Sequence, residues 1–275
     1  HLYELASNTL KETSFGESIM ASEKRFGFEW NKYNEILPEY EHQFLNWTKP
    51  LKNSDYAGKR VLDAGCGMGR NSYWPASYGA KMVVGFDYDI RSVKSAKHNL
   101  AVFNNAEIIF NSIYDIDYNN EFDIVFSIGV IHHLKNPKLA ISNLIKATSP
   151  GGRILIWVYS YEGNEWIVKY INPLRKIITS KLPVGIVHSI SYLFSMPLYI
   201  FVKIFKGPSK YLKQLSKYSY AHIHSIVFDQ LIPEIANYWT KEEAQDLFKF
   251  DDIKNLEILK PKNNMGWIVT CIKKS

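Results

Sequence analysis

The segment VLDAGCGMGR, residues 61–70, carries three glycines at alternate positions, a spacing suited to binding a ligand through the backbone. Gly65, Gly67 and Gly69 lack a Cβ, so the chain can turn tightly there and approach a ligand closely. A helical pattern begins directly afterwards, and the free N–H groups at its start would face the same ligand. Asp63 precedes the glycines, where a carboxylate repels phosphate and favours a positively charged ligand.

Two common phosphate-binding motifs do not fit this loop. A dinucleotide fingerprint needs a glycine at its sixth position, which here is Arg70 or Ser72, depending on the starting glycine. A P-loop needs a Gly-Lys-Ser/Thr sequence, and none follows. A second acid, Asp87, ends the next apolar run, where the hydroxyl groups of an adenosine ribose would find a bidentate acceptor. The pattern therefore indicates an adenosine-containing ligand.

Histidines supply the candidates for acid–base chemistry. His132 and His133 follow the fourth apolar run, at the edge where α/β sheets bind ligands, and both structural and catalytic roles suit them. His222 and His224 would share one face of a strand, but on a helix they are about 200° apart. The apolar residues that follow have a helical period, which places Asp229 on the face of His222. Further metal ligands are missing nearby, so an acceptor site or a structural contact is favoured and no metal is predicted.

Alternating strand and helix patterns must position these residues. Five apolar runs rich in Val and Ile alternate with helical patterns between residues 60 and 159, which is typical of a doubly wound α/β sheet. A capping box at residues 240–243 opens a last helix, and two final runs are predicted to form a hairpin. We therefore divide the chain into three parts. They are a helical leader (1–57), a core (58–159 and 240–275) and a mainly helical cap insertion (160–239).

The insertion carries the excess positive charge of the chain. No Asp or Glu occurs in residues 166–228, which hold nine Lys or Arg, whereas the remainder has fewer basic than acidic residues. Residues 182–202 contain no charge and are long enough to span a membrane, but Pro183 and Pro197 argue against one clean helix. We expect a cap over the site, with peripheral contact between residues 166–228 and an anionic membrane as an open alternative.

Four motifs in order resemble those of the class I S-adenosylmethionine-dependent methyltransferases, over residues 58–159 and 240–275. They are VLDAGCGMGR, VVGFDYD, EFDIVFSIGVIHHLKNP and SPGGRILI. The resemblance implies an α/β fold with a seven-stranded, mostly parallel, Rossmann-like sheet whose last strand is antiparallel. It implies S-adenosylmethionine as cofactor and S-adenosylhomocysteine as product.

The resemblance also implies which residues hold the cofactor. Its amino acid portion lies over the glycine loop, and its ribose meets the acid that ends the second strand. The adenine usually meets an acid after the third strand, where this chain has Ser112, so Ser112, Ile113 or Asp115 could serve. The residues expected at the cofactor are Asp63, Gly65, Cys66, Gly67, Asp87, Tyr88, Ser112, Ile113, Ser127 and Ile128.

Methyl transfer is an in-line displacement at a sulfonium carbon, so the protein must mainly align the acceptor and exclude water. An oxygen acceptor also needs a base, for which the candidates are His133, His222, His224 and Asp229. We expect a small-molecule acceptor, anionic or lipid-linked, with transfer to oxygen. Alternatives are an RNA or protein methyltransferase, a carboxymethyl transferase using a modified cofactor, and a non-catalytic binding module. Nucleic acid is disfavoured because the basic segment is as apolar as it is basic.

The cellular setting is predicted from two further features. Cys66 and Cys271 are the only cysteines and lie far apart in the sequence, which favours a reducing compartment. The first residues show no basic stretch followed by an apolar run, so no secretory signal is expected. We therefore predict a cytoplasmic protein, with membrane association left open. The sequence does not predict an oligomeric state.

Overall fold

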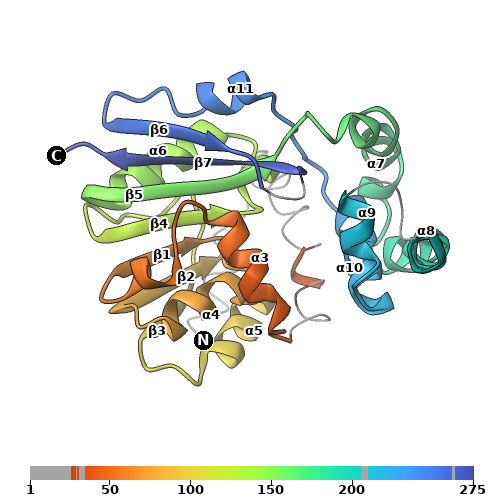
Figure 1. Cartoon of the computed structure of the whole chain (residues 1–275), viewed down its shortest axis with the longest axis horizontal. Helices are drawn as coiled ribbons and strands as arrows, with labels where there is room; N and C mark the ends of the chain where they lie inside the picture. The colour runs from red at the N-terminus through yellow and green to blue at the C-terminus, as the bar shows by residue number, and fades with distance from the viewer. Residues whose placement is uncertain (1–25, 29, 31–34, 206–209, 262–263) are drawn as a thin grey trace, which may run out of the picture.

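The computed structural model describes residues 26–28, 30, 35–205, 210–261 and 264–275. Within them, seven strands form one sheet in the order β3-β2-β1-β4-β5-β7-β6. The strands β1 to β5 are parallel neighbours, and β7 runs antiparallel to both β5 and β6. This topology confirms the predicted fold class (Figure 1). The strands are β1 (Arg60–Ala64), β2 (Met82–Asp87), β3 (Ala106–Phe110), β4 (Phe122–Ile128), β5 (Thr148–Tyr159), β6 (Ile253–Leu259) and β7 (Gly266–Lys273).

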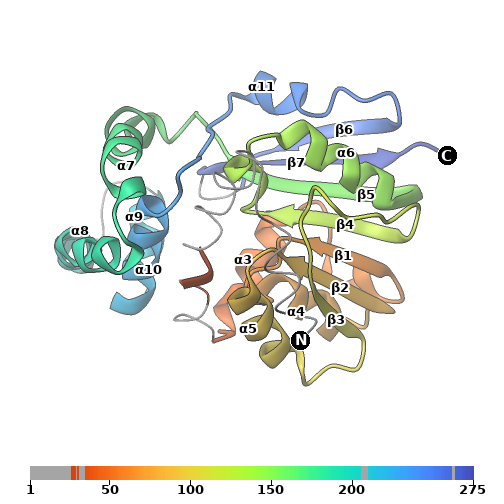
Figure 2. The ribbon, with the colours of Figure 1, turned by 180° about the vertical axis from the view of Figure 1, so that it is seen from behind.

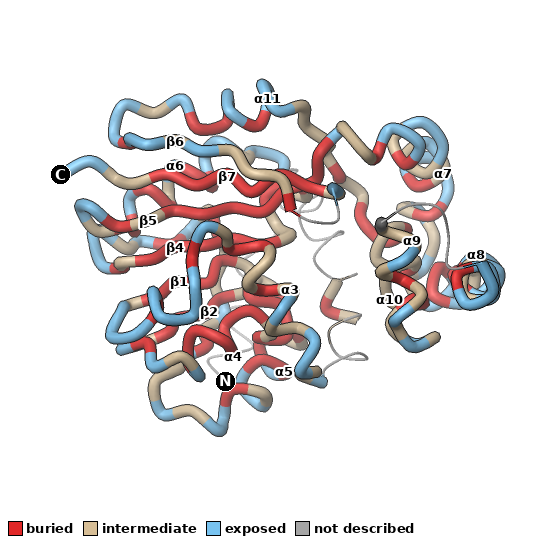
Figure 3. The backbone as a smooth tube through the Cα atoms, viewed as in Figure 1, coloured by how far each residue is buried: buried red, intermediate tan, exposed pale blue. Residues whose placement is uncertain are grey.

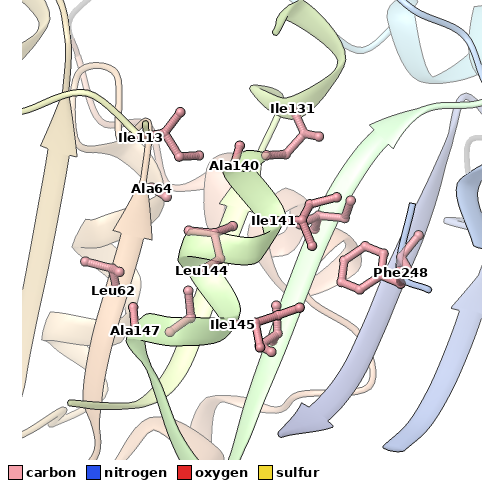
Figure 4. Packing of buried hydrophobic residues seen from close by; sticks show 14 of the residues in the cluster. Leu62, Ala64, Ile113, Ile131, Ala140, Ile141, Leu144, Ile145, Ala147 and Phe248 are labelled. Carbon is pink, nitrogen blue, oxygen red and sulfur yellow. The ribbon is translucent and has the colours of Figure 1, made fainter. Parts of the chain in front are cut away.

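One face of the sheet is covered by α6 (Pro137–Ala147) and α11 (Lys241–Asp246), seen in front in Figure 2. The Asn136 side chain accepts a hydrogen bond from the Leu139 N–H (3.2 Å), and the Thr240–Glu243 capping box is present, as predicted. Figure 4 shows how the apolar side chains of α6 pack on the strands. The buried residues labelled there are Leu62, Ala64, Ile113, Ile131, Ala140, Ile141, Leu144, Ile145, Ala147 and Phe248.

The opposite face is covered by α3 (Glu39–Trp47), α4 (Arg70–Ser77) and α5 (Ile90–Leu100). Phe44 of α3 is fully buried, and its ring centroid lies 5.7 Å from that of Phe126 in β4. The two short 3₁₀ helices of the core are η1 (Asn53–Tyr56) and η2 (Ile131–His133). The part of the leader from α3 to η1 therefore belongs to the core packing of this face.

The helices of the insertion lie beyond the carboxyl ends of the parallel strands (Figure 1). They are η3 (Ile167–Ile171), α7 (Asn172–Ile177), η4 (Thr179–Lys181), α8 (Val184–Phe205), α9 (Lys210–Leu215) and α10 (Tyr220–Leu231). Contrary to our expectation for residues 182–202, α8 is one helix that contains Pro197. Pro183 precedes its first turn, where a missing N–H costs nothing. The boundaries of leader, core and insertion stay a prediction.

We predict that Phe44→Ala lowers the free energy of unfolding by about 3–5 kcal/mol, because it leaves a cavity between α3 and β4. Urea denaturation measures this change. His42→Ala, an exposed position on the same helix, is the control and should change stability by less than about 0.5 kcal/mol. Equal stability of the two variants would show that α3 does not pack on the sheet.

Candidate functional site

A cavity of about 310 Å³ lies at the carboxyl ends of the parallel strands. Its walls come from three parts of the chain: the core loops, the leader and the helices α9 and α10 of the insertion. This is the edge where open α/β sheets bind ligands, because the loops after neighbouring strands meet there. The cavity therefore brings together residues that are far apart in the sequence.

The glycine loop follows β1 and forms the floor of the cavity. Gly65 and Gly67 have φ angles of 79° and 55°, in the left-handed region that favours glycine. The Gly65 and Cys66 N–H groups donate to the Phe86 carbonyl at 2.9 and 2.8 Å, which fastens the loop to the end of β2. A Cβ at Gly65 would lie 2.4 Å from the Val130 side chain. The packing of the fold therefore requires glycine at position 65, whether or not a ligand is bound.

Asp87 ends β2 and lines the cavity beside the loop. Its Oδ2 accepts a hydrogen bond from the Gly67 N–H, and its Oδ1 accepts one from the Asp89 N–H, both at 2.9 Å. Burial raises the pKa of Asp87 to about 6, although these two donors act to lower it. Tyr88 also lines the cavity, with its ring stacked on Phe110 at 5.3 Å. Asp87 thus offers carboxylate oxygens, and Tyr88 an aromatic ring, to one ligand.

Two of the residues expected at the cofactor lie beneath the loop and do not line the cavity. Asp63 is fully buried and accepts a hydrogen bond from the Ser72 hydroxyl at 2.7 Å, and burial raises its pKa to about 7. Ser127 donates its hydroxyl hydrogen to the Ala64 carbonyl (2.8 Å), which joins β4 to β1. Both positions lie inside strands, so their side chains support the loop from below.

The third strand leads to the far end of the cavity. Ser112 and Ile113 line it, as do Cys66 and Ile128, whereas Asp115 is not among the lining residues. Asn111 was not expected there. It accepts a hydrogen bond from the Ser112 N–H through its side-chain oxygen (2.9 Å), which orders this turn.

The leader contributes aromatic rings to the cavity. Phe26 and Trp30 of RFGFEWNKY line it, while Arg25, Glu29 and residues 31–33 lie outside the described residues. A Cβ on Gly67 would lie 3.2 Å from the Trp30 indole nitrogen, so this ring covers the glycine loop.

Arg70, the last residue of the glycine motif, also lines the cavity and was missed by the sequence analysis. Its guanidinium lies 4.9 Å from the ring centroid of Tyr40, 5.5 Å from that of Trp47 and 5.6 Å from that of Trp30. Cation–π attraction holds the charge between these rings. The only sequence signal was the arginine after three glycines, since its aromatic neighbours are distant along the chain.

His133, His222 and Asp229 line the cavity together. The His133 Nδ1–H donates to the Ile235 carbonyl at 2.7 Å, so the neutral ring carries its lone pair on Nε2. Burial lowers the pKa of His133 to about 3. Burial and the charge of Arg70 lower that of His222 to about 4. Both rings are therefore neutral near pH 7.

Asp229 belongs to the same helix face as His222, as the helical period predicted. Burial raises its pKa to about 6, while Arg70, Arg175 and a hydrogen bond from the Tyr159 hydroxyl act to lower it. A carboxylate with this pKa is mostly ionised at pH 7 and can still accept a proton.

His224, a catalytic candidate, does not reach the cavity, and this expectation is corrected. Its side chain is buried between α10 and α8, where Nδ1 lies 2.9 Å from the Ser195 hydroxyl and Nε2 lies 3.3 Å from Nε2 of His188. On a helix it must point away from His222, and α8 occupies that side.

His132 is also buried outside the cavity, with its ring stacked on Tyr159 at 3.8 Å. Within the described residues, no cluster of three or more His, Cys, Asp or Glu could hold a metal ion.

Comparison with known proteins agrees with this geometry. A family model described as a methyltransferase domain matches residues 55–180. The chain is 29% identical over 126 residues to the tRNA U34 carboxymethyltransferase of Campylobacter hominis, covering 45% of this chain and 43% of that protein. It is 32% identical over 145 residues to the mitochondrial ubiquinone biosynthesis O-methyltransferase of Dictyostelium discoideum, covering 48% and 44%. The chain thus spans less than half of the length of each of these relatives.

Solved structures share the fold at low sequence identity. A protein of Pyrococcus horikoshii superimposes with a TM-score of 0.55 at 16% identity, over 86% of this chain and 92% of that one. A SAM-dependent methyltransferase of Aquifex aeolicus gives a TM-score of 0.50 at 14% identity, over 86% and 97%.

The residues present fit S-adenosylmethionine. The glycine loop leaves room for its amino acid portion, and Asp87 can accept hydrogen bonds from its ribose hydroxyls. The buried Oδ1 of Asp63 has no hydrogen-bond partner in the described part of the chain, and a positively charged ligand above it would favour the ionised carboxylate. Residues 55–180 therefore match a methyltransferase domain, and the cavity that they help to form fits S-adenosylmethionine.

Proposed function

We propose that the protein is an enzyme that transfers the methyl group of S-adenosylmethionine to an oxygen atom of a small molecule. The observation that carries this proposal is that one cavity contains both the glycine loop with Asp87 and the groups His133, His222 and Asp229. A binding module needs only the first set. Neutral imidazoles and an ionised carboxylate in the same cavity supply what an oxygen acceptor requires.

Asp229 takes the role of proton acceptor. S-adenosylmethionine, held by the glycine loop and Asp87, would supply a methyl group on a sulfonium and would leave as S-adenosylhomocysteine. The hydroxyl proton passes to the Asp229 carboxylate, whose pKa of about 6 lies near neutral pH. His133, with its Nε2 lone pair, and His222 line the same side of the cavity and can accept hydrogen bonds from other polar groups of the acceptor.

The leader and the insertion align the reactants and exclude water. Trp30 lies over the glycine loop, and the Phe26 ring lies 4.8 Å from the ring of His133, at the acceptor side. Tyr218 stacks on His222 at 4.1 Å and fixes the plane of its ring. Fixed geometry of this kind accounts for much of the rate in a displacement whose methyl donor is already reactive.

Arg70 supports an anionic acceptor but also favours a second candidate reaction. One relative is named a tRNA carboxymethyltransferase, and a carboxylated cofactor would need a cation, which Arg70 supplies inside the cavity. The same guanidinium could pair with the carboxylate of the ordinary cofactor. We therefore favour methyl transfer, with a lipid-linked or anionic small molecule as acceptor. We place the enzyme in the cytoplasm, where the buried thiols of Cys66 and Cys271 stay reduced.

We predict that Asp87→Asn weakens S-adenosylhomocysteine binding by about 10- to 100-fold, because the ribose loses a charged hydrogen-bond acceptor. Isothermal titration calorimetry measures this. For the wild-type protein, affinity should fall as the pH drops through about 6, where Asp87 gains a proton, and the Asn variant should lose this dependence. Asp115→Asn, an exposed acid outside the cavity, is the control. Normal affinity in Asp87→Asn would exclude the ribose assignment.

We predict that Asp229→Asn lowers methyl transfer at least about 100-fold while cofactor affinity changes by less than about threefold. The assay follows labelled methyl from S-adenosylmethionine into the small-molecule, RNA and protein fractions of a cell extract. With S-adenosylmethionine at saturating concentration, the wild-type rate should rise between pH 5 and 7 as Asp229 loses its proton, and the rate of the variant should not. Glu242→Gln, on the exposed surface of α11, is the control.

The fraction that takes up the label decides between the candidate functions. Label in RNA or protein would overturn the small-molecule proposal. A complete lack of transfer by a protein that binds the cofactor would favour a binding module. Transfer that requires a carboxylated cofactor would favour the second reaction.

A further inference from the structure

The helix α8 presents a large apolar face to the outside of the molecule. It lies at the outer edge of the insertion, on the side of α10 away from the sheet (Figures 1 and 3). Only 22% of its most apolar stretch is buried, and this stretch has a mean hydropathy of 1.5. The exposed apolar residues of α8 are Ile186, Tyr192, Leu193, Phe194, Met196, Ile200, Phe201, Ile204 and Phe205.

The buried stripe of α8 is the more polar one. His188, Ser191 and Ser195 are buried against α10, together with two valines. Ser195 lies 2.9 Å from His224 Nδ1 and 3.1 Å from the Tyr220 hydroxyl. A surface helix of a water-soluble protein has the opposite arrangement, with its apolar stripe inward and its polar stripe outward. The distribution in α8 therefore indicates that its outer face meets a non-aqueous partner.

Exposed lysines come before, within and after α8 along the chain. Residues 166–228 contain no Asp or Glu. The exposed lysines are Lys169, Lys176 and Lys181 before α8, Lys203 on it, and Lys213 and Lys217 after it. A second copy of the chain packed on this face would bring like charges together, whereas anionic headgroups would neutralise them. Exposed Trp166 and Tyr170, just before α7, are residue types that favour the membrane–water boundary.

We propose that the outer face of α8 docks the protein on the surface of a membrane that contains anionic lipids. The helix lies in the plane of the interface, because its other side is held to α10 by packing and by the His224–Ser195 hydrogen bond. Its 22 residues extend about 33 Å, long enough to enter the headgroup region along several turns. Membrane docking depends on this surface and not on the proposed methyl transfer. An experiment can therefore overturn one of the two proposals and leave the other standing.

The test is co-sedimentation of the full chain with lipid vesicles. The wild-type protein should bind vesicles of phosphatidylcholine mixed with phosphatidylserine. It should bind phosphatidylcholine alone at least about tenfold more weakly, and added salt should weaken binding to the mixed vesicles. No binding to the mixed vesicles would overturn the proposal.

Matched variants show whether α8 is responsible. The triple variant Leu193→Gln, Ile200→Gln, Ile204→Gln should lose at least about tenfold in vesicle binding while keeping S-adenosylhomocysteine affinity. The control replaces three exposed apolar residues on other elements, Ile90→Gln, Val102→Gln and Leu139→Gln, and should bind vesicles as the wild type does. Equal binding by the α8 variant would exclude α8 as the docking surface.

Charge and assembly provide two further readouts. Replacing Lys176, Lys181 and Lys213 by Glu should weaken binding by about fivefold or more for each lysine. Analytical ultracentrifugation of the wild type and the α8 triple variant tests whether a second copy of the chain covers this face instead of a membrane. A wild-type dimer that the variant converts to a monomer would assign the face to a second copy of the chain. Resistance of the bound wild type to alkaline extraction would replace interfacial docking by a membrane span.

Discussion

The hydrogen bond from the Gly67 N–H to the Asp87 carboxylate joins the two strand ends on which the whole site is built. Strands β1 and β2 are parallel neighbours, so their carboxyl ends lie at the same edge of the sheet. The Phe86 carbonyl accepts two more hydrogen bonds from the loop, which leaves the backbone little freedom. The left-handed φ angles that this path requires explain why the sequence has glycine there. The cavity keeps its shape because its floor is fixed on both strands.

Buried charge connects the insertion to this core. The positive charges of Arg70, in the core helix α4, and of Arg175, in α7, act to lower the pKa of Asp229 on α10. Burial of a carboxylate is costly unless positive charge lies nearby, and burial of the Arg175 guanidinium is costly unless negative charge lies nearby. The balance leaves the pKa of Asp229 near 6. Arg70 of the core therefore acts on a carboxylate of the cap, and the balance of burial and positive charge prepares Asp229 to accept a proton.

The parallel strands could be predicted because they are mostly apolar runs that alternate with helical patterns, and the helix at residues 220–231 because its period placed Asp229 with His222. The positions of Asp63 and Ser127 could not be predicted, since both strand faces are buried and alternation does not reveal which residues reach the ligand. His224 was misassigned because its partner helix α8 was unknown. The aromatic surround of Arg70 was missed because its rings come from residues far away in the sequence.

Helix α10 explains why the apolar face of α8 cannot turn inward. The two sides of α10 have different surroundings. His222 and Asp229 face the cavity, whereas Ile223, His224 and Phe228 on the other side are buried. The His224 ring makes a hydrogen bond with Ser195 of α8. Rotating α8 to hide its apolar face would break the His224–Ser195 hydrogen bond and leave buried polar groups unpaired, at a cost of about 1–3 kcal/mol each. The polar contact that holds the cap together thus fixes the orientation of α8. Its apolar side must then be covered by something other than the protein's own core.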